Sequence, residues 1–446
     1  MGRHRNHIDR FFRLPPGFLN LLMKGLVHAA IFAFSIFSAS LVHAQDTNAS
    51  RNLSLEQALE LARDNTENLD APRTHIASVR ARLRAIGAMP APELRLRQDE
   101  GRLAGESSQE YALRFRLNNP WETKALVEEG QARTEVARIQ LKLTENILSN
   151  EVKRLYFETL YRKKDALLAR EIAETQAAIR TAHDILVAAG QLTLPKALES
   201  RLETYETLAE ASKADRTYES VSSTLLALLD QPEGTPVNLV TAFSKPDKNT
   251  SNLTLNNLFS TATLGHPELI SLEHEGEAAR ARIHQAEARR IPWFSFLQGN
   301  IEHDRRISSD SDQWGVLLGI EIPMWGHRAD IHAATVELHE NLAIQRLARR
   351  DLRLTLASSL RDYRATSRQL SQHETASAKL ESELAPALEE SPNGQDIDPV
   401  SRNLLRIGLF EVRRKLLEAR YQFQSAHLAL EDALGQPLRE VLFQKE

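Results

Sequence analysis

The spacing of apolar residues changes along the chain, and its longest helical stretch covers residues 122–189. This stretch contains no proline and only one glycine, Gly130. As a continuous helix it would measure roughly 100 Å. Its apolar residues step by four and three positions, which predicts a seam packed along a partner helix. The seam comprises Leu148, Val152, Leu155, Thr159, Leu168, Ile172, Thr175, Ile179, Ala182 and Leu186.

The predicted partner helix follows directly in the sequence. Residues 196–231 again lack glycine and proline, and the same spacing recurs at Leu198, Leu202, Tyr205 and Ala209. A helix, a turn and a returning helix predict an antiparallel helical hairpin. Its tip would consist of Gly190, Gln191, Leu192 and Thr193. We expect this tip to contact a partner protein, the alternative being a bare solvent-exposed turn.

Before the long helix, the spacing of apolar residues drops to two. Residues 93–98 and 111–117 alternate between apolar and polar side chains and are separated by a glycine-rich turn. This alternation predicts a β-hairpin at about 93–118, with one apolar face and one polar face. The polar face would carry Arg95, Arg97, Arg114 and Arg116.

The same order of elements recurs about two hundred residues later. Pro92 matches Pro292, and the Gln-Pro pair that begins at Gln231 matches the pair that begins at Gln436. An internal repeat of this length predicts two copies of one structural unit. The predicted division is a first repeat at 45–232, a linker at 233–252 and a second repeat at 253–446.

The second repeat predicts its own β-hairpin and helical hairpin. The β-hairpin would lie at about 293–322 with Glu321 on its polar face, although Gln298, Asn300 and Glu302 fit the alternation less well. A long helix would run from 328 to about 390, and Pro386 should kink it or stop it early. The tip would include Gly394 and Gln395, followed by a returning helix with its seam at Val412, Leu416, Ala419, Phe423, Ala426 and Leu430.

Composition and the first residues narrow the class of protein. The chain has no cysteine and a formal net charge of −4, which exclude disulfides and thiolate metal sites and give nucleic-acid binding no support. Residues 1–44 combine a basic start, an apolar run and small residues before a cleavage point after Ala44. They predict a secretory signal peptide, with a single anchoring helix as the alternative.

All four tryptophans lie near predicted strand ends. Trp121, Trp293 and Trp325 lie close to prolines where strands meet helices, whereas Trp314 starts the last strand at its opposite end. This placement favours aromatic girdles at two membrane interfaces, the alternative being core tryptophans beneath a soluble sheet. In a membrane barrel Arg95, Arg97, Arg114, Arg116 and Glu321 would line the lumen. Because four strands cannot close alone, several protomers must share one barrel.

The signal sequence, the duplicated halves, the strand-flanking prolines and the two Gln-Pro ends together resemble the TolC-like outer-membrane efflux factor family. The resemblance implies a mainly α protein with a membrane β-barrel, built as a homotrimer with a shared twelve-stranded barrel and a periplasmic helical tunnel. It also implies an exit duct in the bacterial outer membrane, in contact with lipid. Its partners would be a periplasmic adaptor, also called a membrane fusion protein, and an inner-membrane efflux pump of the RND type. Residues 90–94 and 120–124 resemble the heavy-metal branch of the family.

The sequence shows no enzymatic motif. No Walker loop or dinucleotide fingerprint occurs, and Ala343 stands where a zinc motif starting at His339 needs its second histidine. We therefore expect no catalytic residues, no cofactor and no metal site. The alternative function is a periplasmic coiled-coil adaptor or scaffold. At the second tip, Asp396 and Asp398 form either an acidic ring at the aperture of the tunnel or, for Asp398, a cap of the returning helix.

Overall fold

The computed structural model describes residues 51–100, 107–246, 253–305, 310–323, 327–388 and 398–438. The predicted signal peptide lies outside these ranges. Residue contacts divide the chain into two units, Met1–Asn52 with Gly234–Asn238, and Leu53–Glu233 with Leu239–Glu446. In the parts of the chain that the structure describes, no helix is both long and apolar enough to span a bilayer.

The first long helix, α4 (Pro120–Ala188), forms as the sequence predicts. Asn119 caps its start by accepting a hydrogen bond from Trp121 N at 3.0 Å, and Pro120 occupies the first helical position, where a missing N–H costs nothing. The predicted seam is buried or half-buried along its length, most completely at Val152 and Ile179. Residues outside the seam, such as Tyr156 and Phe157, are buried as well, so this long helix is covered on more than one side.

The first tip is a tight turn that glycine makes possible. Gly190 has a φ of 69°, a left-handed conformation that a side chain disfavours. Its N–H donates to Val187 O at 2.9 Å, and the N–H of Gln191 donates to Leu186 O at 2.8 Å. This pair of bonds is the Schellman arrangement that ends a helix. The chain thus reverses direction at the predicted position.

The returning helix α5 (Leu194–Leu228) packs on α4, but not through the predicted residues. Leu198, Leu202 and Tyr205 are between 51% and 68% exposed, so their assignment to the seam was wrong. Apart from Leu225 and Leu226 near the end of the helix, the buried positions carry small side chains: Ala197, Ser200, Thr204, Ala211 and Ala214. Small residues let the two helices approach closely, and this face has a similar spacing, so periodicity alone could not choose between the two faces.

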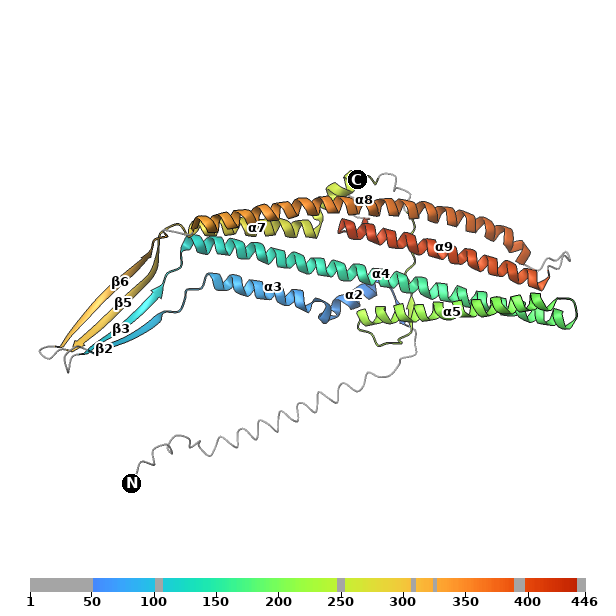
Figure 1. The fold of residues 1–446 in the computed structure, drawn as a ribbon, viewed down its shortest axis with the longest axis horizontal. Coiled ribbons are helices and arrows are strands. Elements are labelled where there is room, and N and C mark those ends of the chain that lie inside the picture. Colours follow the sequence, from blue (N-terminus) through green and yellow to red (C-terminus); the bar gives the residue numbers. More distant parts are fainter. Residues whose placement is uncertain are drawn as a thin grey trace, which may run out of the picture. The chain divides into compact units, whose positions relative to one another are not determined.

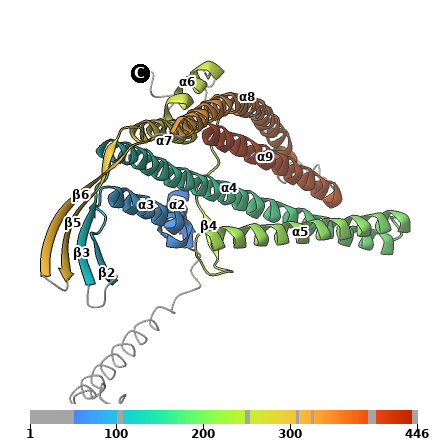
Figure 2. The same cartoon turned by 60° about the vertical axis from the view of Figure 1, so that its left-hand side comes forward.

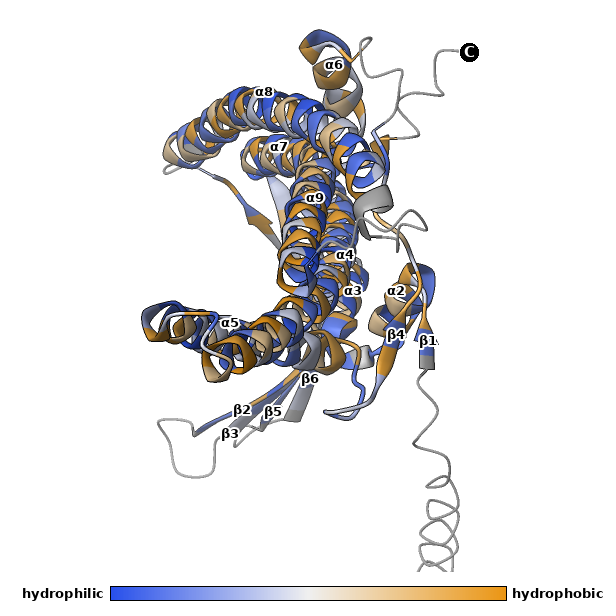
Figure 3. Cartoon of the chain, turned by 90° about the vertical axis from the view of Figure 1, so that its right-hand side faces the viewer, coloured by the Kyte–Doolittle hydropathy of each residue, from blue (hydrophilic) through white to orange (hydrophobic). Residues whose placement is uncertain are grey.

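The second helical hairpin consists of α8 (His327–Leu388) and α9 (Pro399–Leu434). The predicted seam of α9 is buried at Ala419, Phe423 and Leu430, which join a core cluster with Tyr363 of α8. The helix α8 continues through Pro386 to Leu388, so this proline does not stop it. Figure 3 shows polar and apolar residues alternating around the long helices.

Four shorter helices accompany the long ones: α2 (Leu55–Asp64), α3 (Thr66–Ile86), α6 (Leu255–Gly265) and α7 (Pro267–Ala288). Matching positions in the two repeats start α2 and α6, because Ser54 and Thr254 each accept a hydrogen bond from the backbone N–H three residues on. Both α3 and α7 pack against α4 (Figures 1 and 2). Gly130 of α4 faces α3, and a Cβ there would lie 2.7 Å from Cδ1 of Leu83, so the Leu83 side chain would have to shift.

The main sheet joins strands from both halves of the sequence. Its order is β2 (Glu93–Glu100), β3 (Ser107–Arg116), β5 (Trp293–Arg305) and β6 (Asp310–Glu321), and every neighbouring pair is antiparallel. The strands β2 and β6 are its edges (Figure 1). A second sheet pairs the short strands β1 (Arg51–Leu53) and β4 (Val237–Leu239), the latter within the predicted linker.

Candidate functional site

One face of the four-stranded sheet is apolar from edge to edge. The register places Leu94, Leu113, Gly299 and Val316 in one row across the strands. Alternate residues point to the same face, so neighbouring rows extend it along the strands. All the large side chains of this face are exposed: Leu94, Leu96, Tyr111, Leu113, Phe115, Phe294, Leu297, Ile301, Trp314, Val316, Leu318 and Ile320. The described chain leaves this apolar face uncovered.

The opposite face is polar and carries every lumen residue that the sequence predicted. Register places Arg95, Arg97, Arg114, Arg116 and Glu321 on this face. Three cross-strand hydrogen bonds link the remaining polar side chains: Arg114 Nε to Gln298 Oε1 at 2.8 Å, Asn300 Nδ2 to Glu110 Oε1 at 3.2 Å, and Ser108 Oγ to Glu302 Oε1 at 2.7 Å. The residues Gln298, Asn300 and Glu302 therefore fit the alternation well.

Trp314 marks one end of the apolar face, whereas Trp121 packs on Trp293, which the register places on the polar face opposite Glu321. Trp314 is 84% exposed in a row with Tyr111, and the next row outward is polar, with Gln109 and His303. Trp121, 48% exposed at the start of α4, packs edge to face on Trp293 with ring centroids 5.3 Å apart. Neither Trp121 nor Trp314 is a core residue beneath the sheet. Trp325 lies outside the described residues.

The structure describes the whole first helical tip but only the end of the second. The first tip is exposed at Gly190, Gln191 and Thr193. At the second, Gly394, Gln395 and Asp396 lie outside the described residues, so the acidic ring stays a prediction. The capping role of Asp398 is confirmed, because its carboxylate accepts a hydrogen bond from Ser401 N at 3.3 Å.

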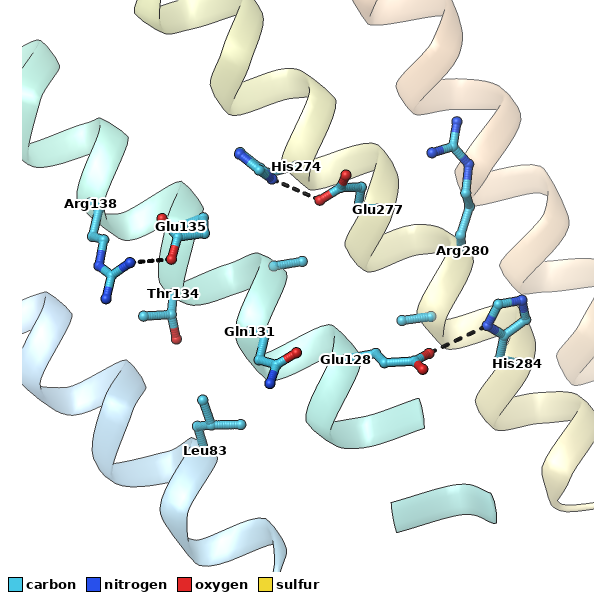
Figure 4. Close-up of a pocket in the computed structure, with 12 residues that line it drawn as sticks. Leu83, Glu128, Gln131, Thr134, Glu135, Arg138, His274, Glu277, Arg280 and His284 are labelled. Atoms are coloured by element: carbon cyan, nitrogen blue, oxygen red, sulfur yellow. Dashed lines mark hydrogen bonds and ion pairs between the residues drawn. The ribbon is translucent and has the colours of Figure 1, made fainter. Parts of the chain in front are cut away.

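A groove of about 610 Å³ lies where α3, α4 and α7 meet (Figure 4). It holds two histidine–glutamate contacts, His274 Nδ1 to Glu277 Oε2 at 2.7 Å and His284 Nδ1 to Glu128 Oε2 at 3.6 Å. Figure 4 shows these two pairs in separate parts of the groove. Across the described ranges, no three histidine or acidic side chains group closely enough to hold a metal ion.

Comparison with solved structures identifies the fold. The chain matches CusC, from crystal structures that concern transmembrane channel formation, with a TM-score of 0.68 at 19% identity, covering 88% of this chain and 96% of that one. It matches the outer membrane protein VceC of Vibrio cholerae with a TM-score of 0.67 at 15% identity, covering 86% and 96%. The outer membrane channel CmeC of Campylobacter jejuni gives 0.68 at 11% identity, covering 85% of each chain.

The chain has the TolC-like fold of outer-membrane channels. No protein-family model matches the sequence, and no curated protein matches it either. The predicted resemblance is thus confirmed as a likeness of fold across most of the chain.

Within this TolC-like fold, a charged cluster that the sequence analysis missed joins the two helical hairpins. Arg414 of α9 contacts Asp165 of α4, with 2.5 Å between Nε and Oδ1, and also Glu210 of α5. Asp165 is only 6% exposed, and its hydrogen bond raises the pKa of the Arg414 guanidinium above its usual range. The sequence did carry a signal for a buried charge here, because Asp165 is a single carboxylate beside the small residues Ala166 and Ala169, which pack in the core.

Proposed function

We propose that the protein is the exit duct of a tripartite efflux system, in the outer membrane of a bacterium with its helices in the periplasm. The apolar face of the sheet carries this proposal. An uncovered apolar surface that crosses four strands is unfavourable in water but matches the hydrocarbon core of a bilayer. The polar face would then line a water-filled passage. Similarity of fold to outer-membrane channels supports the same conclusion.

Two further surfaces of the chain need a neighbour. The edges β2 and β6 leave backbone N–H and C=O groups unpaired, which lipid does not tolerate. On α5, the stripe formed by Leu198, Leu202 and Tyr205 is exposed. We propose that both are covered in a homotrimer, in which four strands from each of three copies close one barrel. The stripe on α5 would pack on a helix of the neighbouring copy.

The oligomeric state in detergent tests this proposal. Light scattering of the purified protein should give the protein mass of three chains. Replacement of Leu202 by glutamate should weaken the trimer, because it places a carboxylate inside the proposed helical contact. Thr224→Glu adds the same charge to α5 outside the stripe and should leave the trimer as stable as in the parent. A monomer that stays soluble without detergent would refute the duct and favour a periplasmic adaptor or scaffold.

We propose that the tips receive the periplasmic adaptor, through which an inner-membrane pump delivers substrate. Thr193 suits a test better than Gly190, since Gly190 needs its positive φ while the Thr193 side chain makes no capping hydrogen bond. A strain that lacks the gene is first tested for growth on metal salts and antimicrobial compounds, with and without the parent gene. Where the parent gene restores growth, Thr193→Arg should fail to restore it. Its trimer and its membrane insertion should match the parent. Full resistance in this variant would place the adaptor contact elsewhere.

A further inference from the structure

Three arginines gather on the part of the polar face nearest the helices. Arg95, Arg114 and Arg116 lie in adjacent rows there, and we call them the arginine belt. Glu93 contacts two of them, with 3.2 Å to Arg95 Nη2 and a second ion pair to Arg116. Glu321 stands farther toward the helices, opposite Trp293. Three guanidinium groups therefore face two carboxylates, and the belt has excess positive charge.

Arg114 differs from the other two because its partners are neutral. No ion pair among the described residues includes it. Its Nε donates to the buried Gln298, and its guanidinium lies over the Phe296 ring, 4.0 Å from the centroid. Gly319 makes room for that ring, since a Cβ there would clash with it. The stacking orients the guanidinium plane. Glu93 lies opposite Arg114 in the strand register but pairs with Arg95 and Arg116, so no carboxylate of the described residues lies within ion-pair distance of Arg114.

The part of the polar face away from the helices is acidic. Among the described residues it carries Asp99, Glu110 and Glu302 against one arginine, Arg97, which pairs with Asp99 at 2.9 Å. Glu110 and Glu302 accept hydrogen bonds from the neutral side chains of Asn300 and Ser108 rather than from a cation. Charge is thus segregated along the strands, with the positive region on the side of the helices.

We propose that Arg114 is an anion-contact site in the wall of the duct, which recognises solutes bearing carboxylate or phosphate groups. A guanidinium whose plane is held by an aromatic ring can offer its two Nη groups as a fork to such an anion. The inference rests on the proposed function, because the polar face encloses a lumen only in the closed barrel. Threefold symmetry then repeats the site in one ring around the passage.

Single channels in planar bilayers test the site, with potassium chloride for ion preference and citrate as the anionic probe. Arg114→Gln should shift the reversal potential in a salt gradient toward cation preference and should weaken citrate block several-fold. Arg97→Gln is the matched control, because it removes an equal charge from the same face but at the acidic end. It should leave citrate block unchanged. Arg114→Lys keeps the charge without the planar fork, so it should keep the reversal potential of the parent and bind citrate more weakly.

The outcomes separate this inference from the proposed function. Parent channels that form, together with equal citrate block in the parent and in Arg114→Gln, would overturn the anion site and leave the duct intact. Equal weakening by Arg97→Gln would also overturn it, because the effect would then reflect overall charge. A parent protein that forms no channel would instead refute the duct itself. Trimer mass and circular dichroism of each variant confirm that the fold is retained.

Discussion

If the apolar face lies in the outer membrane as proposed, replacing Val316 by arginine should prevent insertion, whereas the same replacement at Leu317 should leave the protein inserted. The two residues are neighbours on β6, but they point to opposite faces of the sheet. Val316, 67% exposed, lies in an interior row of the apolar face, while Leu317, 50% exposed, lies beside Gln298 on the polar face. An arginine near the bilayer midplane on the lipid side costs about 2–4 kcal/mol, and a trimer would bear that cost in each copy.

Membrane fractionation and immunodetection measure this result, with the amount of trimer in each fraction as the readout. The two variants differ only in which face receives the charge, so any general effect on synthesis or export is shared. If the protein were soluble, Val316→Arg should instead raise the amount of protein in the soluble fraction, because a charge on an exposed apolar face improves solubility. If Val316→Arg inserts as well as the parent does, the apolar face does not contact lipid.

The elements of this fold could be predicted because each depends on a local pattern. The step from a spacing of two to a heptad spacing separates the strands from α4, and Gly190 marks the end of that helix through its positive φ. The apolar and polar faces also followed from alternation. A β-bulge between Phe294 and Phe296 shifts the phase of the alternation within β5. Without this shift, Gln298, Asn300 and Glu302 are out of phase with the start of the strand in the sequence, although the structure places all three on the polar face.

The packing partners could not be predicted, because they depend on residues far apart in the sequence. On α5, two faces share a similar spacing, and the alanine-rich one is chosen because it matches Ala169 and Ala173 of α4. The larger Leu202 and Tyr205 were the stronger sequence signal and yet remain exposed. In a chain that associates, an apolar stripe can serve a neighbouring copy, so hydrophobicity alone does not assign it to the core of one chain.

The contact between Arg414 and Asp165 likewise spans most of the chain, and its loss should have a large effect. Arg414→Ala leaves the buried Asp165 carboxylate without its cation, which typically costs about 3–5 kcal/mol. Arg413→Ala is the control, because the adjacent Arg413 pairs with Glu381 at 3.1 Å where the two side chains are 47% and 43% exposed. Such exposed pairs contribute about 0–1 kcal/mol. The apparent melting temperature should therefore fall markedly for Arg414→Ala and little for Arg413→Ala.

A double variant distinguishes a buried charge from a simple loss of packing. Arg414→Met with Asp165→Asn removes both charges and keeps most of the side-chain volume, so it should recover much of the stability lost in Arg414→Ala. Asp165→Asn alone should be less damaging than Arg414→Ala, because an amide is easier to bury than an unpaired carboxylate. If Arg414→Ala has the same apparent melting temperature as the parent, water or another cation must reach Asp165 once Arg414 is gone. The two helical hairpins would then be held together by the Tyr161–Tyr421 stack and the apolar seam, without help from this ion pair.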